Sequence, residues 1–231
     1  MRVSEGPRVI LLHATPVAVE PVLDAFSRLW PYARTSNLLD DGLTAERSET
    51  DELEEPLIRR FADLVGYADS TKPDGILITC SAFGPAIDRA AARTRTPIVK
   101  PNEAMFAHAL SAGPRTGMVA TFAPSVPTMT EEYEAVAAIQ RPGATLRTVV
   151  APGAMAALRA GDGETHDKLV AEAAMELSEC DAVLLAHFST ARAARETAAL
   201  SGRTVLTAPD SAVIALRRRL ETTSPPAAAD R

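Results

Sequence analysis

Two side chains that can move a proton follow apolar runs at matching places in the two halves of the chain. The segment from Asp74 to Ile87, DGILITCSAFGPAI, contains Cys80, and the segment from Asp181 to Ala194, DAVLLAHFSTARAA, contains His187. In both segments an aspartate lies six residues ahead of the reactive side chain. A thiol and an imidazole can each take and give a proton near neutral pH. The pair therefore predicts a two-sided proton-transfer site; the alternatives are a small buried cysteine and a histidine held by hydrogen bonds at an interface.

The residues around Cys80 place it at a strand-to-helix turn. Ile76–Ile78 predict a short strand, and Gly84-Pro85 predict a helix start with proline at the first helical position. Open α/β sheets keep their chemistry at the carboxyl ends of strands. The dipole and free N–H groups of a helix start can lower the pKa of a thiol from about 8.5, so we expect a thiolate at Cys80. Cys180 precedes the strand that leads to His187, so we expect it at the opposite edge of the sheet.

Hydroxyl groups gather at the predicted strand ends and helix starts. Hydroxyls and backbone N–H groups at such places bind carboxylate or enolate oxygens, although each alone is more often an N-cap. Together they favour a small anionic substrate. The predicted substrate-binding residues are Thr15, Pro16, Thr79, Ser81, Ala82, Thr121, Ser125, Phe188 and Ser189. Of the other histidines, His13 at the end of the first strand is a further candidate, whereas His108 and His166 are expected to be packing or surface residues.

The elements that must position these residues alternate between strand and helix, as in parallel α/β sheets. Strands are expected at 8–12, 33–39, 76–78, 98–99, 116–120, 146–150, just before 187 and at 204–206. Helices are expected at 19–29, 54–70, 86–93, 104–110, 131–139, 165–178, 191–200 and 212–220. The acid-rich segment DDGLTAERSETDELEE is expected to be a mobile loop that leads into the second helix.

Three pairs of strand-end motifs recur at nearly constant separation. They are HATP at 13–16 with TFAP at 121–124, 108 positions apart; Cys80 with His187, 107 apart; and PNEA at 101–104 with PDSA at 209–212, 108 apart. This period exceeds that of solenoid repeats, so the pattern indicates duplication of a domain.

The duplication predicts an α/β fold of two similar domains with parallel sheets, related by a pseudo-twofold axis. We expect residues 1–111 and 112–208 to form the two domains, with the active site in the cleft between them. The last helix, 209–222, is expected to pack on the first domain. Residues 223–231 have too little apolar surface to fold and are expected to be a flexible tail.

The composition is that of an ordinary globular protein, and it narrows the classes of partner. The 231 residues carry a net charge of −6 and no long basic run, so we expect neither nucleic acid nor a membrane surface as partner. The first apolar run, 9–12, is too short for a secretion signal or a membrane span, so we expect a cytoplasmic protein. The two cysteines form no disulfide framework, and no metal-ligand or nucleotide-loop motif occurs. We therefore expect neither a metal nor a cofactor.

The segments ILITCSAFGPAI and PIVKPNEAM, together with the internal duplication, resemble the aspartate/glutamate racemase superfamily. That superfamily includes aspartate, glutamate and hydantoin racemases, maleate isomerase and arylmalonate decarboxylase. The resemblance covers the chain from Val9 to about Leu220. It implies two Rossmann-like domains, a cofactor-independent reaction at the carbon next to the carboxylate of a small acid or amino acid, and a homodimer or higher homo-oligomer. It also implies one catalytic cysteine from each domain, and Cys80 matches the first.

The second half departs from the family pattern, because Ala186-His187-Phe188 stands where the family usually reads G-C-T. Symmetrical racemisation needs two bases of similar strength, which Cys80 and His187 are not. The expected activity is therefore proton transfer or isomerisation that uses Cys80, with His187 as its counterpart. The alternatives are a one-sided decarboxylase or other lyase of the same family, and a catalytically inactive protein that binds small anions.

Overall fold

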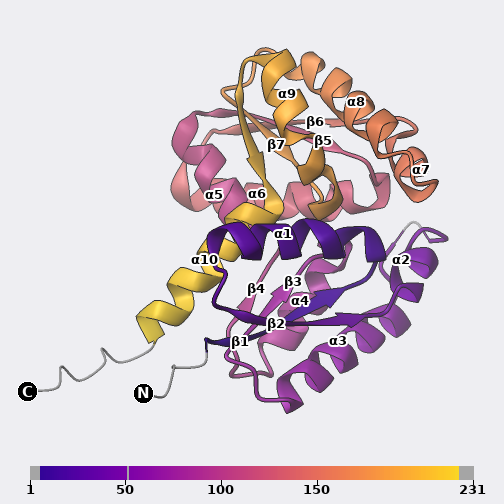
Figure 1. Ribbon diagram of the computed structural model, residues 1–231. Helices are drawn as coiled ribbons and strands as arrows, with labels where there is room; N and C mark the ends of the chain where they lie inside the picture. The colour runs from indigo at the N-terminus through magenta and orange to yellow at the C-terminus, as the bar shows by residue number, and fades with distance from the viewer. Residues whose placement is uncertain (1–5, 51, 224–231) are drawn as a thin grey trace, which may run out of the picture.

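The structure is a computed structural model that describes residues 6–50 and 52–223. Two four-stranded, all-parallel sheets lie one above the other in Figure 1, each flanked by helices. The first has the order β2-β1-β3-β4 and the second β6-β5-β7-β8. The strands are β1 (Arg8–His13), β2 (Arg34–Leu39), β3 (Gly75–Ile78), β4 (Ile98–Val99), β5 (Arg115–Ala120), β6 (Thr145–Val150), β7 (Ala182–Leu185) and β8 (Thr204–Thr207). The predicted fold class, two similar α/β domains with parallel sheets, is confirmed.

Ten α-helices in the described residues connect and cover these strands. They are α1 (Val19–Leu29), α2 (Gly42–Arg47), α3 (Glu55–Ser70), α4 (Gly84–Ala91), α5 (Glu103–Ala112), α6 (Val126–Gln140), α7 (Ala154–Arg159), α8 (Gly163–Ala174), α9 (Ala194–Ser201) and α10 (Ala208–Thr223). The described residues also form short 3-10 turns, which are η1 (Pro16–Ala18), η2 (Ser81–Phe83), η3 (Ala123–Ser125), η4 (Met175–Leu177) and η5 (Phe188–Ala193). The expected tail lies, from residue 224 on, outside the described residues.

The long helices follow from apolar stripes at helical spacing. In α3, Leu57, Phe61, Val65 and Ala68 recur every three or four residues and are all buried. Phe61 stacks on Phe83, with ring centroids 4.9 Å apart. Such an aromatic pair adds about 0.5–1.5 kcal/mol to the burial of the two rings. The stripe therefore ties α3 to η2, the turn that follows Cys80.

The expectation of a mobile loop ahead of α3 is wrong, because that segment contains α2. Leu43 and Thr44 are buried there, although acidic residues surround them in the sequence. The short helix α7 was not expected either. Each of these helices has only six residues, so neither shows the repeated apolar spacing by which a helix is read from sequence.

The helices that follow β4 and β8 pack across the two halves. α5 contacts β5, β7 and β8 of the second sheet, whereas α10 contacts β3 and β4 of the first sheet and α1. A Cβ atom on Gly75 would lie 2.9 Å from Leu216 Cδ1, so α10 packs closely on β3. Arg219 Nη1 also donates to the Ile98 carbonyl at 3.0 Å. The division of the chain into 1–111 and 112–208 stays a proposal, with α5 crossing it.

The largest hydrophobic core spans both sheets. It contains Leu11 and Leu77 from the first sheet and Met118 and Leu184 from the second, all of them fully buried. Burial of this kind contributes about 25 cal/mol per Å² of apolar surface, so the two halves are held together by their common core. In the described part of the chain, no helix combines the length and the apolarity needed to cross a bilayer.

Candidate active site between the two sheets

Cys80 and His187 lie at the carboxyl ends of equivalent strands, and both line one small cavity between the two halves. Cys80 follows β3 and begins η2, while His187 follows β7 and begins η5. The cavity is lined by Thr15, Ala18, Thr44, Thr79, Cys80, Ser81, Ala82, Phe122, Ser125, Met155, Arg159, His187, Phe188 and Ser189. Its volume is about 40 Å³, enough for a few water molecules at most. Entry of a small acid therefore requires the cavity to widen.

Most of the predicted substrate-binding residues border this cavity, and two do not. Thr121 lies behind the imidazole of His187 and contacts its Nδ1. Pro16 lines a neighbouring pocket of about 660 Å³ instead, and Ser189 borders both spaces. Ser189 therefore lies between the larger pocket and the cavity that contains Cys80.

The Cys80 thiol is neutral in this environment. Burial raises its pKa to about 11, and this outweighs the opposing effects of the Ala82 backbone N–H, the Thr44 hydroxyl and the Arg47 guanidinium. The expectation that a helix start lowers the pKa is thus wrong in direction. The physical reason is that burial disfavours the thiolate, while the 3-10 turn η2 separates Cys80 from the start of α4 at Gly84. At neutral pH the thiol is a proton donor, and its use as a base requires a prior deprotonation.

Both ring nitrogens of His187 are engaged by the protein. Nδ1 lies 3.2 Å from the Thr121 backbone nitrogen, whose N–H can only donate, so Nδ1 must be the unprotonated acceptor. The neutral imidazole then carries its proton on Nε2, which lies 2.8 Å from Ser125 Oγ. Ser125 in turn donates to the Phe122 carbonyl at 2.8 Å. Burial, with a smaller effect of His166, lowers the pKa of His187 to about 4.

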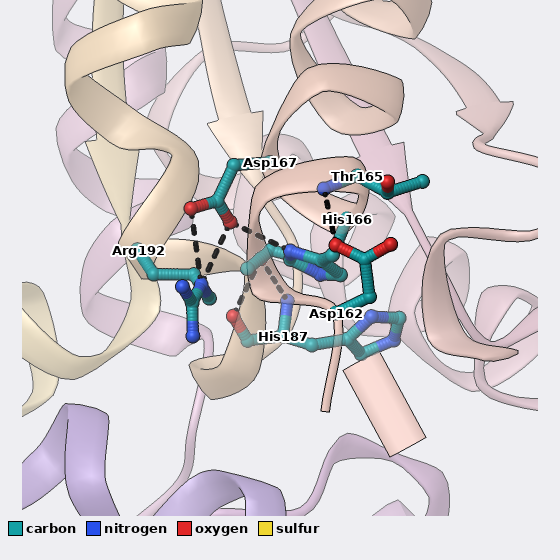
Figure 2. A network of polar contacts seen from close by, with 7 residues as sticks. Asp162, Thr165, His166, Asp167, His187 and Arg192 are labelled. Atoms are coloured by element: carbon teal, nitrogen blue, oxygen red, sulfur yellow. Dashed lines mark hydrogen bonds and ion pairs between the residues drawn. The ribbon is translucent and has the colours of Figure 1, made fainter. Parts of the chain in front are cut away.

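The main chain at His187 is braced by the first turn that follows it. The His187 backbone N–H donates to Thr190 Oγ1 at 3.2 Å, and that hydroxyl donates to the His187 carbonyl at 2.6 Å. Figure 2 shows a second brace beside it, in which Asp167 accepts from Arg192 of η5 at 2.8 Å and contacts His166 Nδ1 at 2.7 Å. Asp167 and His166 belong to α8. The ion pair thus joins η5, the turn that follows His187, to α8.

His13 is fully buried and does not border the cavity. Its Nδ1 contacts Thr79 Oγ1 at 2.9 Å and its Nε2 contacts Asn37 Oδ1 at 3.0 Å. Burial lowers its pKa, against the effect of the Asn37 contact. We interpret His13 as a residue that positions the Thr79 hydroxyl next to Cys80.

Sequence reasoning missed the contribution of α2 and α7. Thr44 borders the cavity from α2, and Arg159 borders it from α7. Both six-residue helices end in arginine, Arg47 and Arg159, at equivalent places after the second strand of each sheet. Arg47 is buried and donates to the Pro124 carbonyl of the other half at 3.1 Å. The 112-residue separation of the two arginines, close to the repeat of the strand-end motifs, was the available signal.

The cavity combines proton-carrying groups with groups that can bind an anion. Hydroxyls of Ser81, Ser125 and Ser189 and the exposed side chain of Arg159 border it, and none of the carboxylates that the structure describes does. Among residues 6–50 and 52–223, no three His, Cys, Asp or Glu side chains are placed to hold a metal ion. A metal-free and cofactor-free site stays a prediction.

Comparison with known proteins gives a consistent picture of the fold. The family model described as Asp/Glu/Hydantoin racemase matches residues 37–219. Glutamate racemase from Bacillus anthracis is similar, with a TM-score of 0.76 and 13% identity over 95% of this chain and 84% of that chain. Aspartate racemase from Picrophilus torridus gives 0.72 and 14% over 94% and 95%. Allantoin racemase from Klebsiella pneumoniae gives 0.70 and 14% over 96% and 91%. A search of curated proteins finds no match.

Proposed function

The chain belongs to the Asp/Glu/hydantoin racemase family, and we propose that it is an isomerase that moves a proton at the carbon next to the carboxylate of a small acid or amino acid. Cys80 is the group that transfers the proton, and no cofactor takes part. The observation that carries this proposal is the convergence of Cys80 and His187, from equivalent strand ends of the two halves, on one cavity. The enzyme is expected to act in the cytoplasm as a homo-oligomer.

Binding of the substrate carboxylate is assigned to the hydroxyl groups and to Arg159. A proton next to a carboxylate is weakly acidic, so the site must stabilise the negative charge that forms on the carboxylate oxygens. Ser81 and Ser125 supply neutral donors from the two halves, and Arg159 supplies a full positive charge at the edge of the cavity. Charge-assisted hydrogen bonds of this kind are stronger than neutral ones.

The state of the Cys80 thiol decides in which direction the proton moves most easily. With a pKa of about 11, the thiolate is populated to about one part in 10⁴ at pH 7, a cost of about 5 kcal/mol. Donation by the thiol to a carbanion carries no such cost. This favours a second candidate function, in which a substrate with two carboxylates on one carbon loses CO2. The electron pair left on that carbon then takes the Cys80 proton, and the thiolate recovers its proton from water.

A substrate panel separates these functions from a protein that only binds anions. We expect the purified chain to change the optical rotation of one amino or hydroxy acid, or to release CO2 from a substituted malonate. The activity should be lost in Cys80→Ala and kept in Cys180→Ala, whose cysteine lies at the far end of β7. Binding of small acids without any turnover across the panel would support the inactive protein instead. Turnover that survives in Cys80→Ala would overturn the assignment of Cys80.

A further inference from the structure

The hydrogen bonds around His187 fix which of its nitrogens carries the proton. The Thr121 backbone N–H, 3.2 Å away, requires a lone pair on Nδ1, and the Thr121 hydroxyl lies 3.1 Å from the same nitrogen. A proton on Nδ1 would face that N–H directly. The imidazole is therefore held in its neutral form with the proton on Nε2, and it has no lone pair to offer on the side of the cavity.

Ser125 is hydrogen-bonded to the protonated Nε2 of this tautomer. Its Oγ accepts from His187 Nε2–H at 2.8 Å, which strengthens the polarity of its own O–H bond. The hydroxyl currently donates to the Phe122 carbonyl, and the Ser125 backbone N–H also donates to that carbonyl, at 3.2 Å. Rotation of the hydroxyl toward a ligand therefore leaves the carbonyl with a partner. Ser125 is only 1% exposed, yet it borders the same cavity as Cys80.

The position of Ser125 in the fold also favours the binding of negative charge at its hydroxyl. It ends η3 and is the N-cap of α6, a helix of 15 residues. The positive end of the helix dipole therefore lies beside the hydroxyl and stabilises negative charge there. The helix end alone would define no site. Here, however, it coincides with the buried Ser125 hydroxyl, whose oxygen already accepts a hydrogen bond from His187 Nε2–H.

We propose that His187 is a positioning residue in its neutral Nε2–H form and that Ser125 is the catalytic residue of the second half, donating a hydrogen bond to the substrate oxygen that gains negative charge. No proton leaves Ser125 or His187 in this step. Of Cys80 and His187, only Cys80 exchanges a proton with the substrate carbon; in an inversion, the proton on the opposite face comes from water. The inference rests on the proposed function, because it assigns a role within that reaction.

Matched substitutions at position 187 distinguish a donor from an acid or base. In His187→Gln the side-chain amide can still donate to Ser125 Oγ but cannot titrate, whereas His187→Ala removes the donor. We expect kcat of His187→Gln to stay within about tenfold of the wild type and to keep its pH profile. We expect His187→Ala and Ser125→Ala to lose kcat by about 100-fold or more, the loss typical of a missing donor to a developing anion, with little change in KM. Equal, large losses in His187→Gln and His187→Ala, or a pH limb that disappears in His187→Gln, would overturn the inference while the proposed function stands.

A spectroscopic measurement keeps the inference testable if an alanine variant fails to fold or if the substrate search fails. The 15N chemical shifts of an imidazole distinguish protonated from unprotonated nitrogens, and the His187 signals are those that vanish in His187→Gln. Between pH 5.5 and 8 we expect an unprotonated Nδ1 and a protonated Nε2, with no titration of this ring. An unprotonated Nε2, or a doubly protonated ring at pH 6.5, would refute the assigned tautomer. Failure of the proposed function would instead appear as absence of turnover in the wild type.

Discussion

Glu132 gives the sharpest prediction for stability, because its carboxyl is held between the two halves with few partners. It lies on α6, and its Oε2 accepts a long hydrogen bond of 3.4 Å from Asn102 Nδ2. Glu132 Oε1 and Asn102 Oδ1 are both buried, and neither has a hydrogen-bond partner among the residues that the structure describes. A Cβ atom on Gly84 would lie 3.0 Å from Oε1, so the carboxyl packs against the first residue of α4. Burial raises the pKa of Glu132 to about 7, against the Asn102 contact and Lys100, while Asp88 and Glu103 raise it further.

The sign of the effect on stability follows from the raised pKa. An ordinary glutamate has a pKa of about 4.5, so the folded chain binds this proton more tightly than the unfolded chain does. The tighter binding of the proton by Glu132 stabilises the folded state. This stabilisation is complete below pH 4.5 and is lost as the pH rises through 7. Each pKa unit corresponds to about 1.4 kcal/mol, so the group destabilises the fold by about 3 kcal/mol at pH 8 but by less than about 1 kcal/mol at pH 5.

Replacement by glutamine removes this titration and keeps the shape of the side chain. The amide of Glu132→Gln can also donate to Asn102 Oδ1, which now lacks a donor. We expect Glu132→Gln to be stabilised relative to the wild type, with a free energy of unfolding that gains about 2–3 kcal/mol more at pH 8 than at pH 5. Urea unfolding followed by circular dichroism at both pH values measures this difference.

The matched control is Glu131→Gln, which neutralises the exposed neighbour on the same helix. It should change the free energy of unfolding by less than about 0.5 kcal/mol at either pH. If Glu132→Gln shows no pH-dependent gain, or if Glu131→Gln shows the same gain, the argument from burial of Glu132 is wrong.

Three further predictions test packing and the cavity. Gly84→Ala should destabilise the fold by about 1–3 kcal/mol in urea unfolding, since its Cβ would meet Thr128 Cγ2 at 2.6 Å, whereas Gly66→Ala in the open interior of α3 should not destabilise it; similar losses at both positions would contradict this. Arg159→Gln should raise KM about tenfold or more with little change in kcat, and Arg159→Lys should restore much of the loss; an unchanged KM would remove Arg159 from the carboxylate site. Alkylation of Cys80 by iodoacetamide, followed by mass spectrometry, should accelerate about tenfold per pH unit up to about pH 10, because burial raises its pKa to about 11; a plateau below pH 9 would show an activated thiolate.

The fold could be predicted from the sequence because recognisable polar and proline-containing motifs follow the apolar strands. Apolar runs before Cys80 and His187, and the repeated motifs around them, predicted where the strands lie along the chain and the equivalence of the two halves. The helices α2 and α7 could not be read in this way. Each makes little more than one turn, so a buried Leu43 or an Arg159 facing the cavity has no periodic context in the sequence.

The chemistry of the site depends on packing that no local pattern records. A cysteine ahead of a helix start favours a thiolate in sequence terms, yet burial between the two halves raises the pKa of Cys80. Likewise, the position of His187 predicts a titrating imidazole, but the Thr121 backbone N–H occupies Nδ1. That contact joins residues 66 positions apart, and only the paired ends of β5 and β7 bring them together.

The central claim, that Cys80 exchanges a proton with the carbon next to a substrate carboxylate, is tested most directly by one isotope measurement. The wild type, Cys80→Ala and Cys180→Ala are incubated in deuterated water with the acid that the panel identifies, and deuterium at that carbon is counted by mass spectrometry. We expect incorporation by the wild type and by Cys180→Ala, and a loss of at least about 1,000-fold in Cys80→Ala. Undiminished incorporation by Cys80→Ala would contradict the account.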